Sequence, residues 1–267
     1  MLWGKMIVRL ISRRSAPEFY GGTEKYTLEN CLSFSRKTVP NFDQCVAGKN
    51  ILDYGCGHGW QAVAMRKTCG ARSVFGVDII ESNIEFASAL AQQHECGDCV
   101  RFGLTIPEEL RGTFDVVASI SAFEHYPNPG QEIQRMRSYL KPSGVLIISF
   151  AEPWFSPFGS HFSGYTRIPG TSLPVPWLNL LLRDRALLSL RSQFRTDRPS
   201  RLEDVAGGLN RMTVSKFERL IRDSGMAVES MQLFAVKGIP LVTRIPVLRE
   251  LFTNAASSVL RCDQDRS

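Results

Sequence analysis

The chain of 267 residues is long enough to bury one large core, since 43% of its residues are hydrophobic and 22% are charged. It needs no second domain for that purpose. No apolar run approaches the roughly 20 residues of a membrane-spanning helix, which argues against an integral membrane protein. The seven cysteines are odd in number, and Cys56 stands in a glycine-rich loop that a disulfide would obstruct. We therefore expect reduced thiols and a cytoplasmic protein.

The net charge of +6 is unevenly distributed. Residues 1–50 carry eight Lys or Arg against four acids, residues 151–211 carry eight Arg against five acids, and the part between them is net acidic. The basic flanks indicate an anionic substrate, an acidic partner, an anionic membrane surface or only a solvated face. No nucleic-acid partner is expected, because no binding module or basic-aromatic alternation is present.

The N-terminus has the pattern of a basic amphipathic helix over residues 1–14. Its basic residues recur every four positions, while apolar residues occupy another face: Lys5, Arg9 and Arg13 against Trp3, Met6, Ile7 and Leu10. Such a helix can rest on the inner face of an anionic membrane. The commoner alternative is a helix that closes over a substrate site.

Strands and helices alternate from residue 51 to residue 150, the pattern of a parallel sheet covered on both faces. Strands are predicted at 51–54, 73–77, 100–104, 114–120 and 145–150. Helices are predicted after Gly59, from Glu81, and from Ile133 through Met136 to Leu140, with a turn at Pro142 and Gly144 before the fifth strand.

Residues 151–211 form a long connection that departs from this alternation. They are rich in proline and in aromatic residues, namely Trp154, Phe155, Phe158, Phe162, Tyr165 and Trp177. Long connections of this kind are usually lids or binding loops. Because this one follows the fifth strand at the carboxyl end of the sheet, we expect it to form a substrate cap containing a helix from Trp177 to Leu190.

The C-terminal part, residues 212–267, is predicted to be helix, strand and helix. Thr213 is a candidate N-cap of the first helix and Gly225 its C-terminal glycine. Residues 228–236 fit an antiparallel strand. After Pro246, apolar residues up to Leu260 follow helical spacing. That last helix is expected to pack on the core, line the substrate entrance or pair two subunits in a homodimer.

The most informative segment runs from Asp53 to Gly59, with the sequence Asp-Tyr-Gly-Cys-Gly-His-Gly. It follows a strand and precedes a helix, and Asp78 ends the next strand. This motif resembles the signature of class I S-adenosylmethionine-dependent methyltransferases, in particular the broad small-molecule and quinone group with a type 11-like domain. The likeness continues through 75–80, 114–129 and 140–150 in the same order.

The resemblance implies a Rossmann-like, doubly wound α/β fold with a mostly parallel seven-stranded sheet and a helical, aromatic cap inserted after the fifth strand. The whole chain is then one methyltransferase domain. Its parts are an N-terminal helical cap (1–48), a cofactor-binding core (49–150), the substrate cap insertion (151–211) and the C-terminal completion (212–267).

The resemblance also assigns roles around S-adenosyl-L-methionine. Asp78 binds the ribose hydroxyls, with a helix N-cap as the alternative, and Asp53 helps to hold the ammonium group, with a loop-ordering carboxylate as the alternative. The remaining assigned residues are Gly55, Cys56, Gly57 and Gly59 of the loop, Ser119 beneath the methionyl part, and Ile79, Leu104 and Thr105 around adenine. Many relatives have an acid just after the third strand, whereas this chain has none before Glu108.

Two histidines are candidate general bases, His125 after the fourth strand and His161 in the cap. An imidazole suits proton transfer near neutral pH, and either ring can instead only order its loop. No metal site is expected, and Cys96 and Cys99 are interpreted as two small loop residues because no second metal-binding pair accompanies them.

These observations predict a methyltransferase that acts on an oxygen atom of a small-molecule acceptor. Catalysis then consists mainly of alignment and the exclusion of water. The alternatives are a quinone, lipid or lipid-linked glycan acceptor at a membrane surface, a nitrogen or carbon centre, and a cofactor-binding regulator or scaffold without turnover.

Overall fold

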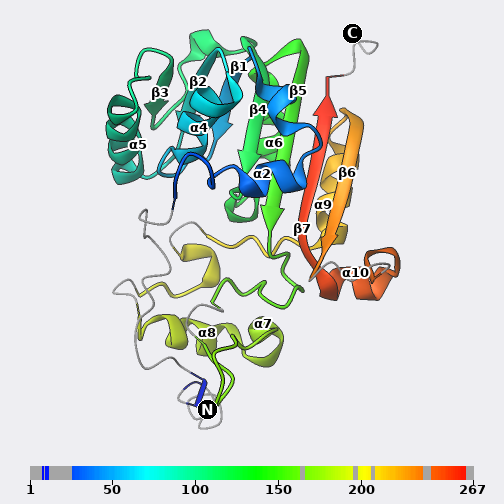
Figure 1. The fold of residues 1–267 in the computed structure, drawn as a ribbon. Coiled ribbons are helices and arrows are strands. Elements are labelled where there is room, and N and C mark those ends of the chain that lie inside the picture. The colour runs from blue at the N-terminus through cyan, green and yellow to red at the C-terminus, as the bar shows by residue number, and fades with distance from the viewer. Residues whose placement is uncertain are drawn as a thin grey trace.

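The computed structural model describes Val8, Leu10, Ile11 and the ranges 26–162, 166–194, 198–205, 208–236 and 242–262. A seven-stranded sheet lies at its centre, in the order β3-β2-β1-β4-β5-β7-β6. The strands are β1 (Asn50–Tyr54), β2 (Ser73–Val77), β3 (Val100–Gly103), β4 (Phe114–Ile120), β5 (Leu140–Ala151), β6 (Ala227–Ala235) and β7 (Thr253–Arg261). The first five pair in parallel, and β7 runs antiparallel between β5 and β6 (Figure 1).

Helices cover both faces of the sheet, because neighbouring residues of each parallel strand point to opposite faces. Ile51 packs with α2 (Ser33–Thr38), α3 (Phe42–Val46), α4 (Trp60–Cys69) and α5 (Glu81–Gln93). Leu52 packs with α6 (Pro129–Ser138) and α9 (Val214–Asp223) on the other face. Short 3-10 turns complete the core: η2 (Glu108–Leu110) and η3 (Phe123–His125). The predicted doubly wound α/β fold is confirmed.

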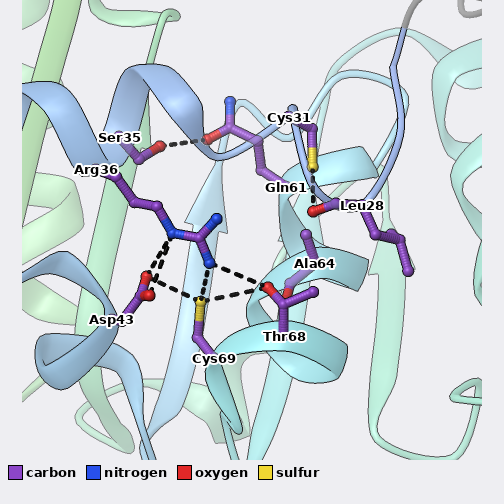
Figure 2. A network of polar contacts seen from close by, with 9 residues as sticks. All are labelled: Leu28, Cys31, Ser35, Arg36, Asp43, Gln61, Ala64, Thr68 and Cys69. Carbon is purple, nitrogen blue, oxygen red and sulfur yellow. Dashed lines mark hydrogen bonds and ion pairs between the residues drawn. The ribbon is translucent and has the colours of Figure 1, made fainter.

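Polar contacts join α2 and α3 to α4 (Figure 2). Arg36 lies 2.9 Å from Asp43 through Nε and also reaches Thr68. The thiol of Cys69 donates to Asp43 at 3.2 Å. Ser35 donates to the side-chain oxygen of Gln61 at 3.1 Å. These contacts hold the N-terminal helices against the helix that follows the glycine-rich loop.

The C-terminal prediction is only partly confirmed. Thr213 caps α9 by accepting from the Lys216 N–H at 3.1 Å, and Gly225 follows the helix with φ +67°. The predicted final helix is wrong beyond Phe252: α10 spans Pro246–Phe252, and 253–261 form β7. A strand buried on both faces has no alternation, so its apolar residues matched a helical spacing by chance. The predicted final helix was one candidate surface for subunit pairing, and only its first part, α10, is helical.

Two other boundaries differ from the predictions. Strand β5 begins at Leu140 rather than after Gly144, because Leu140 pairs with Phe114 before the register shifts. The predicted helix from Trp177 to Leu190 is two helices, α7 (Leu178–Leu181) and α8 (Asp184–Arg191). They are separated because Leu182 and Arg183 have extended backbone.

Residues 151–211 are called the cap below. Those that the structure describes after Ala151 lie beyond the carboxyl end of β5 (Figure 1). Besides α7 and α8, the cap holds η5 (Leu202–Asp204), and η7 (Val242–Arg244) precedes α10. The cap has its own apolar cluster, formed by Val8, Ile11, Phe162, Leu178, Leu182, Leu187, Leu190 and Leu202. Tyr165 lies outside the described residues.

The N-terminal segment reaches this cluster. Val8, Leu10 and Ile11 are helical, and the other residues of the basic helix predicted over 1–14 lie outside the described residues. Val8 and Ile11 are buried, and the Arg167 N–H donates to the Ile11 carbonyl oxygen at 2.7 Å. Among the described residues, no helix combines the length and the apolar character needed to cross a bilayer.

Candidate active site

The glycine-rich loop after β1 combines close packing with an open backbone. Gly55, Gly57 and Gly59 all have positive φ, at +83°, +52° and +77°. A Cβ on Gly55 would lie 2.6 Å from the Ala122 Cβ, and a Cβ on Gly59 would lie 2.6 Å from the Ala87 Cβ. A Cβ on Gly57 would meet nothing within 4 Å. Gly55 and Gly59 are therefore required by packing, whereas Gly57 leaves its backbone accessible to a ligand.

Asp78 follows β2 and braces this loop. Its Oδ2 accepts the Gly57 N–H at 2.9 Å, and its Oδ1 accepts the Ile80 N–H at 3.0 Å and the Asn83 amide at 3.1 Å. A carboxylate has about four acceptor positions, so three are occupied. Binding both hydroxyls of a ribose requires one of these donors to leave. The helix N-cap alternative is wrong, because the N-cap of α5 is Ile80, and at the start of this helix Asp78 accepts only the backbone N–H of that residue.

Asp53 lies in β1 and is buried. Its Oδ2 is fully enclosed and has no hydrogen-bond partner among the described residues. The pKa of Asp53 is raised to about 7, mainly by burial and to a smaller extent by the charge of Asp78. A buried carboxyl with a free acceptor atom is suited to an ammonium group, which favours the ionised form.

The adenine side is apolar and open. Val77 of β2 pairs with Gly103 of β3, so Ile79 and Leu104 lie just beyond the ends of adjacent strands. Their side chains are 87% and 45% exposed. Thr105 is exposed as well. Large apolar side chains that flank a strand edge fit the flat faces of a purine ring, and these three residues stay the predicted adenine contacts.

Cys56 and Ser119 are buried within the loop support. Burial raises the pKa of the Cys56 thiol far above its ordinary value, so the thiol stays protonated. Ser119 and the Tyr126 hydroxyl lie 2.9 Å apart, and Tyr126 donates its proton to the Tyr54 carbonyl oxygen at 2.8 Å. Ser119 is therefore the donor to Tyr126. Through Tyr126, the Ser119 hydroxyl supports the backbone at the start of the glycine-rich loop. Tyr126 was not among the site residues predicted from the sequence.

The two candidate bases meet at the boundary between core and cap. The rings of His125 and His161 pack edge to face with centroids 5.6 Å apart. The His125 Nδ1 lies 2.8 Å from the Gly208 carbonyl oxygen. A carbonyl oxygen only accepts, so Nδ1 carries the proton and Nε2 is the free acceptor. Burial lowers the pKa of His161 to about 4, so its imidazole stays neutral near pH 7.

Two glutamates stand beside these histidines, and sequence reasoning missed them. Glu124 precedes His125 and is buried, and burial raises its pKa. Glu152 follows β5; burial and the charge of Glu124 raise its pKa to about 7. Glu152 and His161 both have left-handed backbone, with φ +55° and +56°. Strained backbone beside buried acids is typical of functional sites. The sequence held a signal for both glutamates: a Glu-His pair after the fourth strand and a single acid directly after the fifth.

Distant residues hold this region in place. Asn210 donates from its side-chain amide to the Phe123 and Tyr126 carbonyl oxygens at 2.9 Å each. Its backbone N–H donates to the Glu124 carbonyl oxygen at 3.0 Å. Among the described residues, no group of three or more His, Cys, Asp or Glu is arranged for a metal ion. The site thus combines a cofactor loop with a titratable cluster contributed by core and cap.

Comparison with known proteins identifies the family. Residues 28–230 match a family whose description is a methyltransferase domain. The chain belongs to this family. With its glycine-rich loop and Asp78, it is a class I S-adenosylmethionine-dependent methyltransferase, and S-adenosylmethionine is the cofactor of this class. The buried acceptor of Asp53, the open backbone of Gly57 and the exposed Ile79 fit that cofactor.

Similar proteins cover different parts of this methyltransferase. The ubiquinone biosynthesis O-methyltransferase of Psychrobacter arcticus is 36% identical over 108 residues, which are 39% of this chain and 41% of that protein. The chain spans less than half the length of the curated relatives it matches. An S-adenosylmethionine-dependent methyltransferase from Mesorhizobium loti has a TM-score of 0.55 at 20% identity, covering 88% of this chain and 100% of that one.

A solved structure from Listeria monocytogenes shares the fold as well. It has a TM-score of 0.54 at 18% identity and covers 86% of this chain and 96% of that chain. The likeness extends beyond the core into the cap and the C-terminal strands, which confirms the predicted fold class.

Proposed function

We propose that the protein transfers a methyl group to an oxygen atom of a small-molecule acceptor. S-adenosylmethionine supplies an activated methyl group when bound. The observation that carries the proposal is the placement of His125 and His161 after β4 and in the cap, beside a loop built for the cofactor. The relatives that share the core are O-methyltransferases by name, which supports oxygen as the acceptor atom.

The residues of the chain then have separate tasks. Asp53 holds the ammonium group, Asp78 binds the ribose and Ile79 packs against adenine. The backbone of Gly57 lies against the methionyl part. The same reading keeps the chain as one domain, with residues 49–150 binding the cofactor and the cap binding the acceptor.

His125 is the preferred proton acceptor. Its Nδ1–H is fixed on the Gly208 carbonyl oxygen, so Nε2 is free to take the proton of the acceptor hydroxyl. His161 stays neutral because burial lowers its pKa to about 4. A neutral, half-buried imidazole is suited to orienting the acceptor.

Titration calorimetry with S-adenosylmethionine and with its demethylated product tests the cofactor site. Micromolar binding of both is expected, followed by transfer of labelled methyl groups to phenolic, quinone or glycan-lipid acceptors. Binding without transfer to any hydroxyl acceptor would favour a regulator or scaffold. Absence of binding would refute the proposed cofactor role of the loop.

A membrane-bound quinone or lipid acceptor is the second candidate. Leu10 is 68% exposed on the N-terminal helix, which supports contact with the inner face of a membrane. Val8 and Ile11 are buried in the cap cluster, which supports a role in closing the cap instead. Removal of residues 1–7 separates the two: loss of vesicle binding supports membrane contact, and loss of turnover alone supports closure.

A further inference from the structure

The cap contains a cavity of about 680 Å³ that the proposed cofactor site does not use. It is lined by α7, by the turn between α7 and α8 with the first residues of α8, and by Trp154 and Arg211. The Trp154 N–H donates to the Met212 carbonyl oxygen at 2.6 Å. It joins Trp154, three residues after the end of β5, to the residue before the Thr213 N-cap of α9. The volume of the cavity lies within the usual range for small-molecule sites, roughly 300–1,000 Å³.

One wall of the cavity carries paired charges. The Arg211 guanidinium lies 2.6 Å from Asp184 and 3.2 Å from Glu203, and it stacks on Trp154 with its carbon 5.1 Å from the ring centroid. Arg211 is therefore a rigid part of the wall. Its single positive charge offsets only one of these two carboxylates. Among the residues that line the cavity, however, three arginines stand against one acid, Asp184, so the lining keeps an excess of basic groups.

Two basic groups of the lining are unpaired. Arg183 and Arg185 both border the cavity and are exposed, and neither takes part in an ion pair with the described residues. Their guanidinium groups present planar, paired donors, the geometry that phosphate and carboxylate groups match. Three of the eight arginines in residues 151–211 thus line this cavity.

The apolar part of the lining consists of leucines of α7 and of the turn after it. Leu180 and Leu181 are 47% and 66% exposed, although both belong to a helix of the cap. Asn179 adds a buried side-chain oxygen that has no hydrogen-bond partner within the described part of the chain. Adjacent exposed leucines at a cavity offer an apolar surface that the chain of a ligand can cover.

We propose that the cap cavity binds a single-chain amphipathic anion, with its phosphate or carboxylate on Arg183 and Arg185 and its chain along Leu180 and Leu181. The proposal rests on the proposed function in one respect, because it makes this anion the acceptor or part of it. The binding itself is independent of methyl transfer and is measured without the cofactor.

Tryptophan fluorescence and calorimetry with dodecyl phosphate, kept below its micelle concentration, test the binding. Micromolar affinity is expected for dodecyl phosphate, with far weaker binding of dodecyltrimethylammonium and of inorganic phosphate. The double variant R183Q/R185Q should lose about tenfold or more in affinity, since two charge-assisted contacts are removed. Leu181→Asn should also weaken the binding of dodecyl phosphate. The matched double variant R219Q/R222Q, on exposed positions of α9, should bind like the wild type.

Equal affinity of R183Q/R185Q and R219Q/R222Q, or equal binding of the cationic and anionic surfactants, would overturn the proposal. Binding to anionic vesicles without binding of monomeric dodecyl phosphate would also overturn it and assign the arginines to a membrane surface. Calorimetry with S-adenosylmethionine on the same samples separates the two proposals. Binding of S-adenosylmethionine without binding of dodecyl phosphate would reject only the proposed anion site in the cap. Binding of dodecyl phosphate without binding of S-adenosylmethionine would reject only the proposed function.

Discussion

The imidazole rings of His125 and His161 meet edge to face, with centroids 5.6 Å apart, across the boundary between the core and the cap. His125 belongs to the turn after β4, and His161 to the segment that follows β5. Since parallel strands end at one edge of the sheet, the two turns are neighbours although many residues separate them. The contact makes the cap a part of the proposed active site rather than a separate cover.

His125→Ala should reduce turnover of any acceptor hydroxyl found in the screen by about 100-fold or more, because it removes the free Nε2 acceptor. His161→Ala should cost less, since the ring is not the preferred base. Cofactor affinity should be unchanged in both variants by calorimetry. His94→Ala, beyond the end of α5, is the matched control. Full activity of H125A would reject His125 as the base.

Cofactor affinity should depend on pH through Asp53. The pKa of Asp53 is raised to about 7, so the carboxyl is mostly neutral at pH 6 and mostly ionised at pH 7.5. The ionised form binds an ammonium group more tightly, and affinity should rise roughly five- to tenfold over this range. Calorimetry on Asp53→Asn should give weaker, pH-independent binding. A flat profile for the wild type would argue against the contact.

Glu152 should make the folded state less stable as pH rises. Its pKa moves from 4.5 to about 7 on burial, so the folded protein holds the proton more tightly than the unfolded chain. Below pH 4.5 this proton contributes on the order of 3 kcal/mol to the free energy of unfolding, relative to high pH. The contribution is lost as the pH rises to about 7.

The variant Glu152→Gln removes this dependence. The free energy of unfolding of E152Q minus that of the wild type should increase from pH 5 to pH 7 in urea titrations. His161 has the opposite trend because its pKa is lowered, but it contributes equally to both proteins. Glu109→Gln, at an exposed position, is the control and should show no such increase. A constant difference would mean that Glu152 ionises as freely as in solvent.

Asp78→Ala should weaken S-adenosylmethionine binding about 100-fold, because hydrogen bonds to a charged acceptor are lost and the Gly57 N–H loses its partner. Asn83→Ala removes one donor but keeps the carboxylate, so its affinity should stay near that of the wild type. Thermal unfolding of both variants checks that the fold is retained. Near-normal affinity of a folded D78A would rule out the ribose contact.

Gly59→Ala should be more destabilising than Gly70→Ala. Both glycines have positive φ, at +77° and +73°, so both variants lose about 1 kcal/mol to backbone strain. At Gly59 the new Cβ also lies 2.6 Å from the Ala87 Cβ, whereas at Gly70 it meets nothing within 4 Å. Overpacking adds roughly 1–3 kcal/mol at Gly59. Urea unfolding measures the difference, and equal losses would contradict the close packing.

Much of the core was predictable because its signals are local. The strands at 73–77 and 114–120 match β2 and β4 in full, since strands buried on both faces are continuous apolar runs. The N-cap at Thr213 was predictable because it depends on residues within one turn. The strand β7 was not: its apolar spacing also fits a helix, and only pairing with β5 and β6 decides between the two.

The sequence by itself determined the cofactor half of the site, because the glycines and the two aspartates lie at strand ends whose positions follow from short-range patterns. Only the tertiary structure decided the acceptor half. The proton position on His125 depends on Gly208, the raised pKa of Glu152 depends partly on the charge of Glu124, and Arg183 lines the same cavity as Arg211. These contacts join residues far apart in the chain, and no local pattern encodes which distant groups will meet.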